Sequence, residues 1–194
     1  MSNETQSAFR IGSVAVIGAG PAGRAFAFRC AAAGFVVVLE DVMPSNLRRA
    51  QDEYAEFVAA VGAKGSLRYA MTVEDAVREA DLAIDFVPDE LESKLEIFSL
   101  LDRMAPPRTI LCTPTGALSI TDLASCTYRA ERCVGLRGDF QNGAAEVVRS
   151  RFLDESVEVA VGEFFAALGV AVIVVGDELE PMLVKNIVAG GISG

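Results

Sequence analysis

Short apolar runs alternate with amphipathic stretches along most of the chain. The runs that read as buried strands are residues 13–18, 36–39, 82–87, 109–112, 133–136 and 170–175. Between them lie helical patterns with recognisable starts: Pro21 suits a first helical position, and the segments 72–75 (TVED) and 119–122 (SITD) match the capping box. This alternation predicts a doubly wound α/β fold, a Rossmann fold, with a mostly parallel sheet.

The predicted organisation is a single domain over residues 11–180. A polar tail, residues 1–10, precedes it, and residues 181–194 begin a C-terminal helix. A chain of 194 residues with 52% hydrophobic content is long enough to bury one good core. No internal repeat or long linker argues for a second domain.

Charge and cysteine content exclude several classes of function. A net charge of −10 disfavours binding to nucleic acid or to anionic membrane surfaces, and the apolar runs are far too short to span a bilayer. Four cysteines occur, and none forms a C-x-x-C pair, so we expect buried thiols and no metal site or disulfide framework. We therefore expect a soluble, cytoplasmic protein that acts on a small molecule.

The chain contains no histidine. This absence excludes Ser-His-Asp hydrolysis, Cys-His proteolysis, metal sites built on histidine and proton transfer by imidazole near neutral pH. Any chemistry must therefore use other groups.

A glycine-rich turn follows the first predicted strand and opens the first predicted helix. Gly18 allows a tight turn, Gly20 lets backbone N–H groups approach a pyrophosphate, and Gly23 lets the helix pack closely on the strand. This context predicts a dinucleotide site, with a structural turn that binds nothing as the alternative. The candidate residues in the turn are Gly18, Ala19, Gly20, Pro21, Ala22 and Gly23.

Two acids, Glu40 and Asp41, end the second predicted strand. Either carboxylate could accept hydrogen bonds from a ribose 2′-OH, and both would repel a 2′-phosphate, so NADP is disfavoured. The alternative is that one of them caps the helix that begins near Pro44. The pattern up to Glu40 also resembles the first motif of FAD-dependent enzymes, so the turn alone leaves the choice between NAD and FAD open.

Residues 72–136 decide that choice through a resemblance. The segment TVEDAVREADLAIDFVPDELESKLEIFSLLDRMAPPRTILCTPTGALSITDLA, followed by RCVGL, resembles the NAD-binding domain of the 3-hydroxyacyl-CoA dehydrogenase family. The resemblance implies NAD as cofactor and Asp41 as the ribose ligand, and it places Pro88, Asp89 and Lys94 beside the cofactor. Read from the residues alone, Asp89 is a helix N-cap and Lys94 lies on a solvated helix face.

The departures from the family affect the chemistry. Members carry Gly-Leu-His-Phe-Phe-Asn-Pro with the histidine as acid/base and a later Glu orienting it; here Arg137 stands at the histidine and Glu146 follows. The family's Ser-Asn-Thr-Ser turn is TPTG, which puts Thr113 at the Ser and Pro114 at the Asn. Arginine cannot lend a proton, although Arg137 could polarise a carbonyl or bind a substrate carboxylate. The alternative is an ion pair between Arg137 and Glu146.

Two further candidates lie near the end of the chain. Asn186 matches the Asn of the family's Pro-Gly-Phe-x-x-Asn-Arg segment, and Lys185 interrupts an apolar run, where desolvation would suit it to acid catalysis. The alternative places Lys185 on an exposed helix face. The candidate catalytic residues are thus Thr113, Arg137, Glu146, Lys185 and Asn186, and Thr113 is also a candidate cofactor-binding residue.

The family continues into a helical domain that supplies the acyl-CoA pocket wall, whereas this sequence stops at Gly194. A second copy could cover the open cleft, and the apolar helix at residues 181–189 would supply the contact, so we expect a homo-oligomer, most simply a dimer. The resemblance implies an oxidoreductase acting on a hydroxyacyl or other small hydroxy substrate, with acyl-CoA and fatty acid metabolism as the family's setting. The rival hypothesis is a catalytically silent NAD-binding sensor or partner protein.

Overall fold

The computed structural model describes residues 9–139 and 143–179. Its strands are β1 (Ser13–Ile17), β2 (Val36–Glu40), β3 (Ser66–Ala70), β4 (Leu82–Asp85), β5 (Ile110–Pro114), β6 (Cys133–Asp139), β7 (Ala144–Arg149) and β8 (Ala171–Gly176). Its helices are α1 (Pro21–Ala33), α2 (Pro44–Val61), α3 (Val73–Val77), α4 (Leu91–Met104), α5 (Ile120–Ser125) and α6 (Glu155–Ala167), with a 3₁₀ turn, η1 (Ala130–Arg132).

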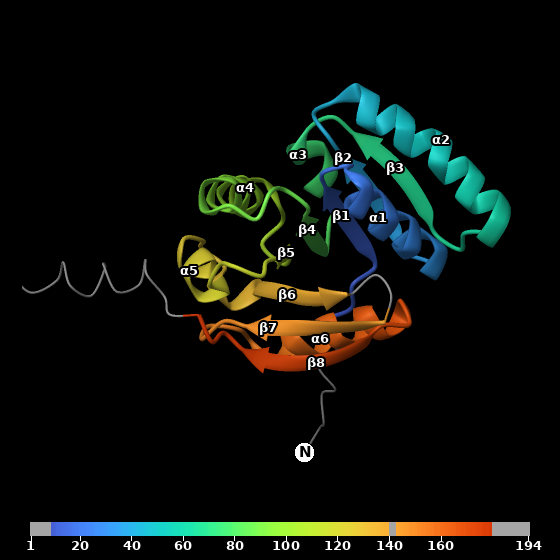
Figure 1. Cartoon of the computed structure of the whole chain (residues 1–194). Helices are drawn as coiled ribbons and strands as arrows, with labels where there is room; N and C mark the ends of the chain where they lie inside the picture. The colour runs from blue at the N-terminus through green and yellow to red at the C-terminus, as the bar shows by residue number, and fades with distance from the viewer. Residues whose placement is uncertain (1–8, 140–142, 180–194) are drawn as a thin grey trace, which may run out of the picture.

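The strands form one eight-stranded sheet in the order β3-β2-β1-β4-β5-β6-β7-β8 (Figure 1). All neighbouring pairs are parallel except β6 and β7, which form an antiparallel hairpin. The doubly wound, mostly parallel fold predicted from the sequence is therefore confirmed. The chain reverses its direction of travel across the sheet between β1 and β4, which is the place where such sheets bind ligands.

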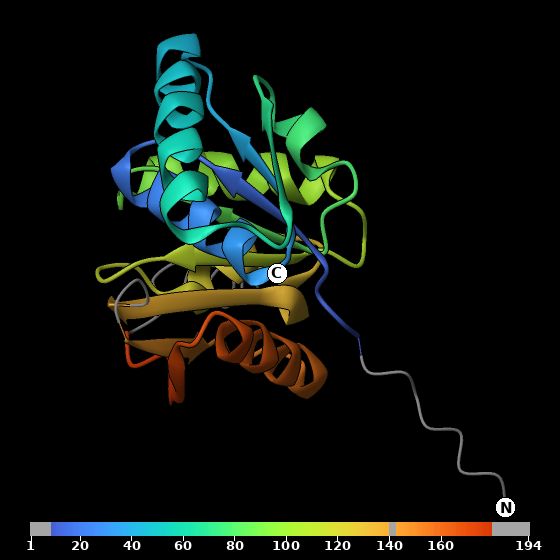
Figure 2. The same cartoon turned by 90° about the vertical axis from the view of Figure 1, so that its right-hand side faces the viewer.

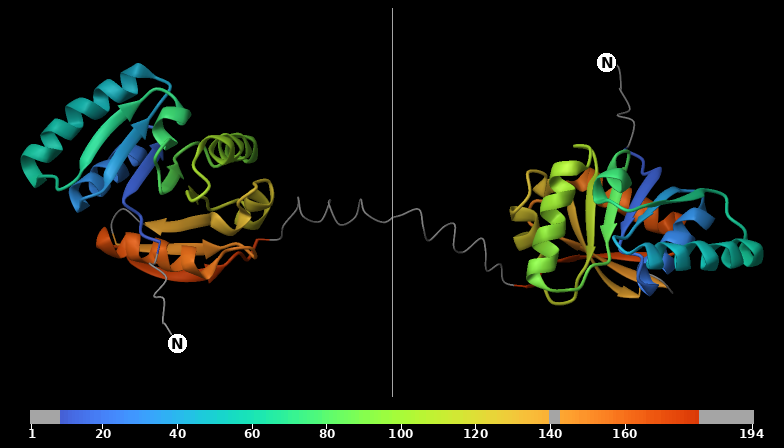
Figure 3. Two further views of the ribbon diagram at one scale, coloured as in Figure 1. Left: turned by 180° about the vertical axis from the view of Figure 1, so that it is seen from behind. Right: turned by 90° about the horizontal axis from the view of Figure 1, so that it is seen from above.

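Helices cover both faces of the sheet, as Figures 2 and 3 show from other sides. On one face α1, α2 and α6 bury an aromatic cluster: the Phe26 ring lies 6.3 Å from Phe164 and 6.4 Å from Phe165. On the other face α3, α4 and α5 pack Val77, Phe98 and Leu123 against the strands. These two apolar layers hold the strand ends that build the site.

The predicted helix starts are confirmed at both capping boxes. The Thr72 side chain accepts from the Asp75 N–H at the start of α3, and the Ser119 side chain accepts from the Asp122 N–H at the start of α5. α4 differs from the residue-only interpretation, because its N-cap is Glu90 and Lys94 is only 1% exposed. The solvated face proposed for Lys94 is therefore wrong.

Two strands were not predicted. β3 has the mixed sequence SLRYA, is an edge strand and stays partly exposed along its length, so it lacks the apolar run of a central strand. In β7 (AAEVVR) the charged residue Glu146 interrupts the apolar run. Both lie outside the contiguous apolar runs that marked the other strands.

Candidate functional site

The glycine turn joins β1 to α1 at the carboxyl edge of the sheet. Gly18 has φ +98°, a left-handed conformation that favours glycine, and its N–H donates to the Glu40 carbonyl at 2.9 Å. A Cβ on Gly23 would lie 1.9 Å from the Gly18 carbonyl oxygen, so only glycine fits there. The close packing of α1 on this turn is as the sequence predicts.

Asp41 ties the turn to the start of α2. Its Oδ2 accepts from the Ala19 N–H at 2.9 Å and from Asn46 Nδ2 at 3.0 Å, and its Oδ1 accepts from the Met43 N–H at 2.8 Å. The side chain thus supports the helix that begins at Pro44 while it fixes the glycine turn. Asp41 thus supports the start of α2, as the capping alternative suggested, and its role as ribose ligand stays a prediction.

Glu40 has a different environment. It is 3% exposed, and its Oε1 has no hydrogen-bond partner among the residues that the structure describes. Burial, with the neighbouring Asp41 carboxylate, raises the pKa of Glu40 to about 7 against a backbone hydrogen bond from Gly18 that lowers it. Its carboxyl therefore holds its proton to a higher pH than an ordinary glutamate does.

The turn leaves room for a pyrophosphate. No atom lies within 4 Å of a Cβ built on Gly20, whereas the neighbouring Ala19 is fully buried. Gly20 is the N-cap of α1 and carries no side chain to cap it. Backbone N–H groups at a helix N-terminus favour phosphate, so these residues fit the dinucleotide that the glycine motif predicts.

A pocket of about 400 Å³ lies at the carboxyl ends of β4, β5 and β6. Its lining comprises Phe86, Val87, Asp89, Lys94, Pro114, Thr115, Gly116, Leu136, Arg137 and Gly138. The pocket thus brings together three of the charged candidates, Asp89, Lys94 and Arg137.

Asp89 holds the turn after β5. Its Oδ2 accepts from the Gly116 N–H at 2.9 Å and the Ala117 N–H at 3.3 Å. Partial burial raises the pKa of Asp89, but hydrogen bonds from Thr115, Gly116 and Ala117 outweigh it and leave the pKa below its ordinary value. The carboxylate therefore stays ionised and is not the cap of α4.

Under the pocket Lys94 forms a buried ion pair with Asp85. The distance from Nζ to Oδ1 is 2.7 Å, and the two side chains are 1% and 0% exposed. Burial raises the pKa of Asp85, whereas Lys94 and the nearby Thr113 hydroxyl oppose the rise. Thr113 Oγ1 and Asp85 Oδ2 each lack a hydrogen-bond partner among the described residues. The hydroxyl therefore lies near the carboxylate but is not in position to form a hydrogen bond with it.

Thr113 is fully buried in β5 and lies beneath the pocket, which Thr115 lines two residues later. Thr115 was not a candidate from the sequence, although its position in TPTG offered a signal: in an extended segment residues two apart point to the same side, which puts a second hydroxyl next to that of Thr113.

Arg137 lies on β6 directly opposite Glu146 on β7. Its Nε donates to the Thr115 carbonyl at 3.3 Å, and its Nη2 lies 4.0 Å from Asp177 Oδ1. Asp177 Oδ2 in turn accepts from Ser119 Oγ and the Thr121 N–H, at 2.7 and 2.9 Å. The carboxylate within ion-pair distance of Arg137 is therefore that of Asp177, and the suggested ion pair with Glu146 is not formed.

Three residues that were not predicted from the sequence support the site through contacts between segments distant in the chain: Arg24, Glu53 and Asp177. A charged residue directly after the third glycine was a signal for Arg24; nothing comparable marked the other two. Lys185 and Asn186 lie outside the described residues.

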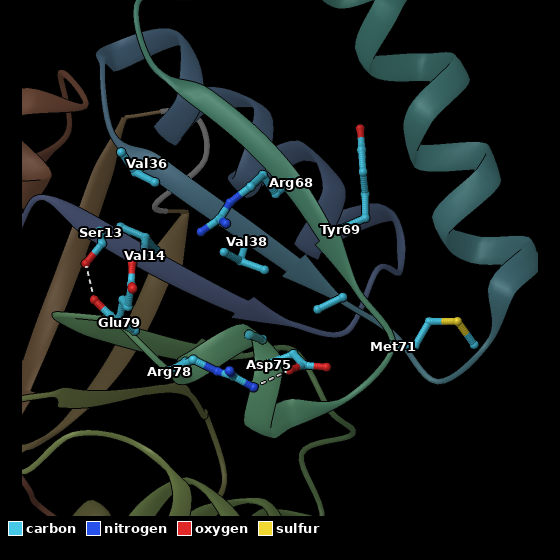
Figure 4. A pocket seen from close by; sticks show the side chains of 13 residues that line it. Ser13, Val14, Val36, Val38, Arg68, Tyr69, Met71, Asp75, Arg78 and Glu79 are labelled. Carbon is cyan, nitrogen blue, oxygen red and sulfur yellow. Dashed lines mark hydrogen bonds and ion pairs between the residues drawn. The ribbon is translucent and has the colours of Figure 1, made fainter.

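A larger hollow of about 550 Å³ lies away from these residues, between β2, β3 and the short helix α3 (Figure 4). Figure 4 shows the Arg68 side chain reaching over Val38, with the Arg78–Asp75 ion pair on the α3 side. None of the predicted site residues lines it.

Over residues 9–139 and 143–179, no group of three or more His, Cys, Asp or Glu side chains could hold a metal ion. Within the same described segments, no helix is long and apolar enough to cross a membrane.

Comparison with known proteins gives one consistent family. The model of the "3-hydroxyacyl-CoA dehydrogenase, NAD binding domain" matches residues 13–178. A probable 3-hydroxybutyryl-CoA dehydrogenase of Bacillus subtilis is 29% identical over 86% of the chain and 63% of the relative. A 3-hydroxybutyryl-CoA dehydrogenase of Bradyrhizobium diazoefficiens is 32% identical over 86% of the chain and 62% of the relative. The chain thus spans a little over three fifths of these two relatives.

Solved structures agree with the fold. A diketoreductase superposes with a TM-score of 0.78 at 28% identity, over 94% of this chain and 70% of that one. An NAD⁺-dependent 5-formyl-3-hydroxy-2-methylpyridine 4-carboxylic acid 5-dehydrogenase superposes with a TM-score of 0.77 at 26% identity, over 93% of this chain and 62% of that one.

Proposed function

The chain belongs to the 3-hydroxyacyl-CoA dehydrogenase family and contains its NAD-binding domain, and from this premise we propose that it is an NAD-dependent oxidoreductase acting on a hydroxyacyl or other small hydroxy substrate. The observation that carries the proposal is the pocket at the ends of β4, β5 and β6, which presents the Arg137 guanidinium beside Lys94 and Asp89. NAD, when bound, supplies hydride exchange with the substrate carbon.

Arg137 is the group that we propose to stabilise the substrate oxygen. Its Nε donates to the Thr115 carbonyl and its Nη2 faces Asp177, so the planar group is held in place. Its other N–H donors have no partner among residues 9–139 and 143–179, which leaves them for a substrate oxygen. A fixed guanidinium favours the negative charge that develops on an alkoxide, but it cannot release a proton. Lys185 remains the proposed proton donor, and Asn186 remains a proposed residue of the catalytic site.

Glu146 and Thr113 take indirect roles in this proposal. Glu146 lies across the hairpin from Arg137 and adds negative charge beside it, whereas Thr113 lies beside the Asp85 carboxyl that pairs with Lys94. Neither needs to touch the substrate.

The test is turnover of NAD(H) by wild type and variants. We expect activity with 3-hydroxybutyryl-CoA, acetoacetyl-CoA or smaller hydroxy acids below the ~10 s⁻¹ of a typical enzyme, because no imidazole assists it. Arg137→Met should abolish it, whereas Arg149→Met, on the same hairpin and paired with Glu158 at 3.5 Å, should leave it intact. Absence of turnover with every substrate class, or equal activity in both variants, would contradict the proposal.

We propose an acyl-CoA thioester as the first substrate class to examine, since the relatives are named for one, and this would place the chain in fatty acid metabolism.

We also propose a cytoplasmic location. The four cysteines are all free thiols, which is the state that a reducing compartment maintains: Cys30, Cys112, Cys126 and Cys133.

A homodimer is the proposed assembly, supported by exposed apolar side chains on the edge strand β8.

A further inference from the structure

Arg24 lies in α1 directly after the third glycine of the turn and is only 7% exposed. Its Nε and Nη2 donate to the two carboxylate oxygens of Glu53 on α2, at 2.7 and 3.1 Å. Its Nη1 donates to the Ala19 carbonyl at 2.8 Å. The guanidinium therefore links α2 to the backbone of the glycine turn by three charge-assisted hydrogen bonds.

Ala19 is held at both of its backbone polar atoms. Asp41 Oδ2 accepts from its N–H at 2.9 Å, while Arg24 binds its carbonyl oxygen. Ala19 is fully buried, so water cannot replace Arg24 as the donor to its carbonyl oxygen. Loss of Arg24 would leave that oxygen without this hydrogen bond. The orientation of the peptide that follows Ala19 is thereby fixed.

That peptide carries the Gly20 N–H. In a trans peptide the C=O and the N–H point in opposite directions, and no cis peptide occurs among the described residues. Because the Ala19 carbonyl points at Arg24, the Gly20 N–H points away from it. No acceptor for that N–H is found in the described part of the chain, and the space beside the Gly20 Cα is open.

We propose that Arg24, held by Glu53, is a positioning residue that aims the Gly20 N–H at the pyrophosphate of the bound dinucleotide. The inference rests on the NAD binding described above and deepens it. Arg24 acts through the backbone and does not itself bind the phosphates, because Glu53 neutralises its charge and three of its five N–H donors are bound by Glu53 and the Ala19 carbonyl.

The chain offers a matched control. Arg129 is similarly buried, at 8% exposed, and its guanidinium donates to Asp102 at 2.9 Å and to the Pro106 carbonyl at 2.6 Å. It supports the end of α4 and contacts no part of the glycine turn. A variant at Arg129 therefore reports what the loss of a buried guanidinium does to the fold alone.

The experiment titrates wild type, Arg24→Met, Arg24→Lys, Glu53→Gln and Arg129→Met with NADH, ADP and adenosine, following NADH and ADP by calorimetry and adenosine by ligand NMR. We expect Arg24→Met to lower the affinity for NADH and for ADP by about tenfold, as the loss of one charge-assisted hydrogen bond implies. The affinity for adenosine should stay unchanged. Arg24→Lys should recover part of the loss, and Glu53→Gln should lose less than Arg24→Met because its amide oxygen still accepts one bond. Arg129→Met should lower the melting temperature without changing any affinity.

Three results would overturn the inference: wild-type affinity for NADH in Arg24→Met, an equal loss in Arg129→Met, or a loss of adenosine binding as large as that of ADP. Failure of wild type to bind NADH would instead refute the proposed function, so the two failures are distinguishable.

Discussion

At the residue scale, Glu40 and Asp41 are adjacent acids in opposite situations. Asp41 accepts three hydrogen bonds from the turn and from α2, whereas Glu40 has a buried oxygen without a partner in the described structure. Their order in the sequence predicted a site for the ribose but could not assign their roles, because the Ala19 and Asn46 contacts depend on how the turn and α2 pack.

Asp41→Ala should weaken NADH binding more than Glu40→Ala does. Loss of the Asp41 carboxylate removes both the proposed ribose ligand and the support of the Ala19 N–H. Calorimetric titration of the two variants compares them directly. Equal losses, or a larger loss in Glu40→Ala, would mean that Glu40 is the ribose acid.

The Glu40 carboxyl should make stability depend on pH. Its pKa rises from the ordinary 4.5 to about 7 in the folded chain, so the folded state binds this proton more tightly than the unfolded state does. The resulting stabilisation of the fold is complete below pH 4.5 and is lost as the pH rises through 7. Glu40→Gln should therefore be more stable than wild type at pH 8, on the order of 2 kcal/mol after allowance for solvent screening, and the difference should vanish near pH 4.5.

Urea denaturation at both pH values measures this difference, with the exposed Glu56→Gln as the control that should show none. A Glu40→Gln variant with the same pH dependence as wild type would show that Glu40 titrates normally.

At the element scale, the Asp85–Lys94 pair joins β4 to α4 beneath the pocket. The family resemblance placed Lys94 beside the cofactor, and the helix pattern alone placed it in solvent. Neither could show that a buried acid on the preceding strand would pair with it, because strand and helix meet only when the β4–α4 crossover closes.

Lys94→Met should destabilise the fold by about 3–5 kcal/mol, since it leaves the Asp85 carboxyl buried without its partner. The double change Lys94→Met/Asp85→Leu should recover most of that loss, because the uncompensated charge is removed. Urea denaturation of Lys94→Met, Asp85→Leu and the double variant gives the free energy of interaction between the two side chains. A double variant no more stable than Lys94→Met would show that the pair is not what holds β4 to α4.

At the scale of the whole molecule, the fold was largely predictable because the central strands are contiguous apolar runs and the capping boxes mark helix starts. The glycine turn and the acids at the end of β2 stood out within one βαβ unit, and their phosphate-binding and ribose-binding roles stay predictions. The supports of the pocket were not predictable in the same way: Asp177 reaches Ser119 and Arg137 from 58 and 40 positions away in sequence. Such contacts are set by sheet order, which pattern and spacing do not specify.

The proposed dimer can be tested at the exposed edge of the sheet. β8 ends the described sheet and exposes Ile173 at 60% and Val174 at 44%, an apolar edge without a charged or proline guard. The C-terminal helix first suggested as the contact, residues 181–189, lies outside the described residues. Light scattering should give a dimer for wild type and for the control Val61→Lys, and a monomer for Ile173→Lys/Val174→Lys. A monomeric wild type, or a dimer that survives the double change in a folded protein, would refute it.

The most direct test of the account is a calorimetric titration of the wild-type chain with NADH, NADPH and FAD under one set of conditions. Asp41 directly follows β2 and would meet a 2′-phosphate with its negative charge, and the open Gly20 turn fits a pyrophosphate. NADH should bind most tightly, and NADPH should bind at least tenfold more weakly, a difference on the order of 1.4 kcal/mol. Equal or tighter binding of NADPH or FAD would contradict it.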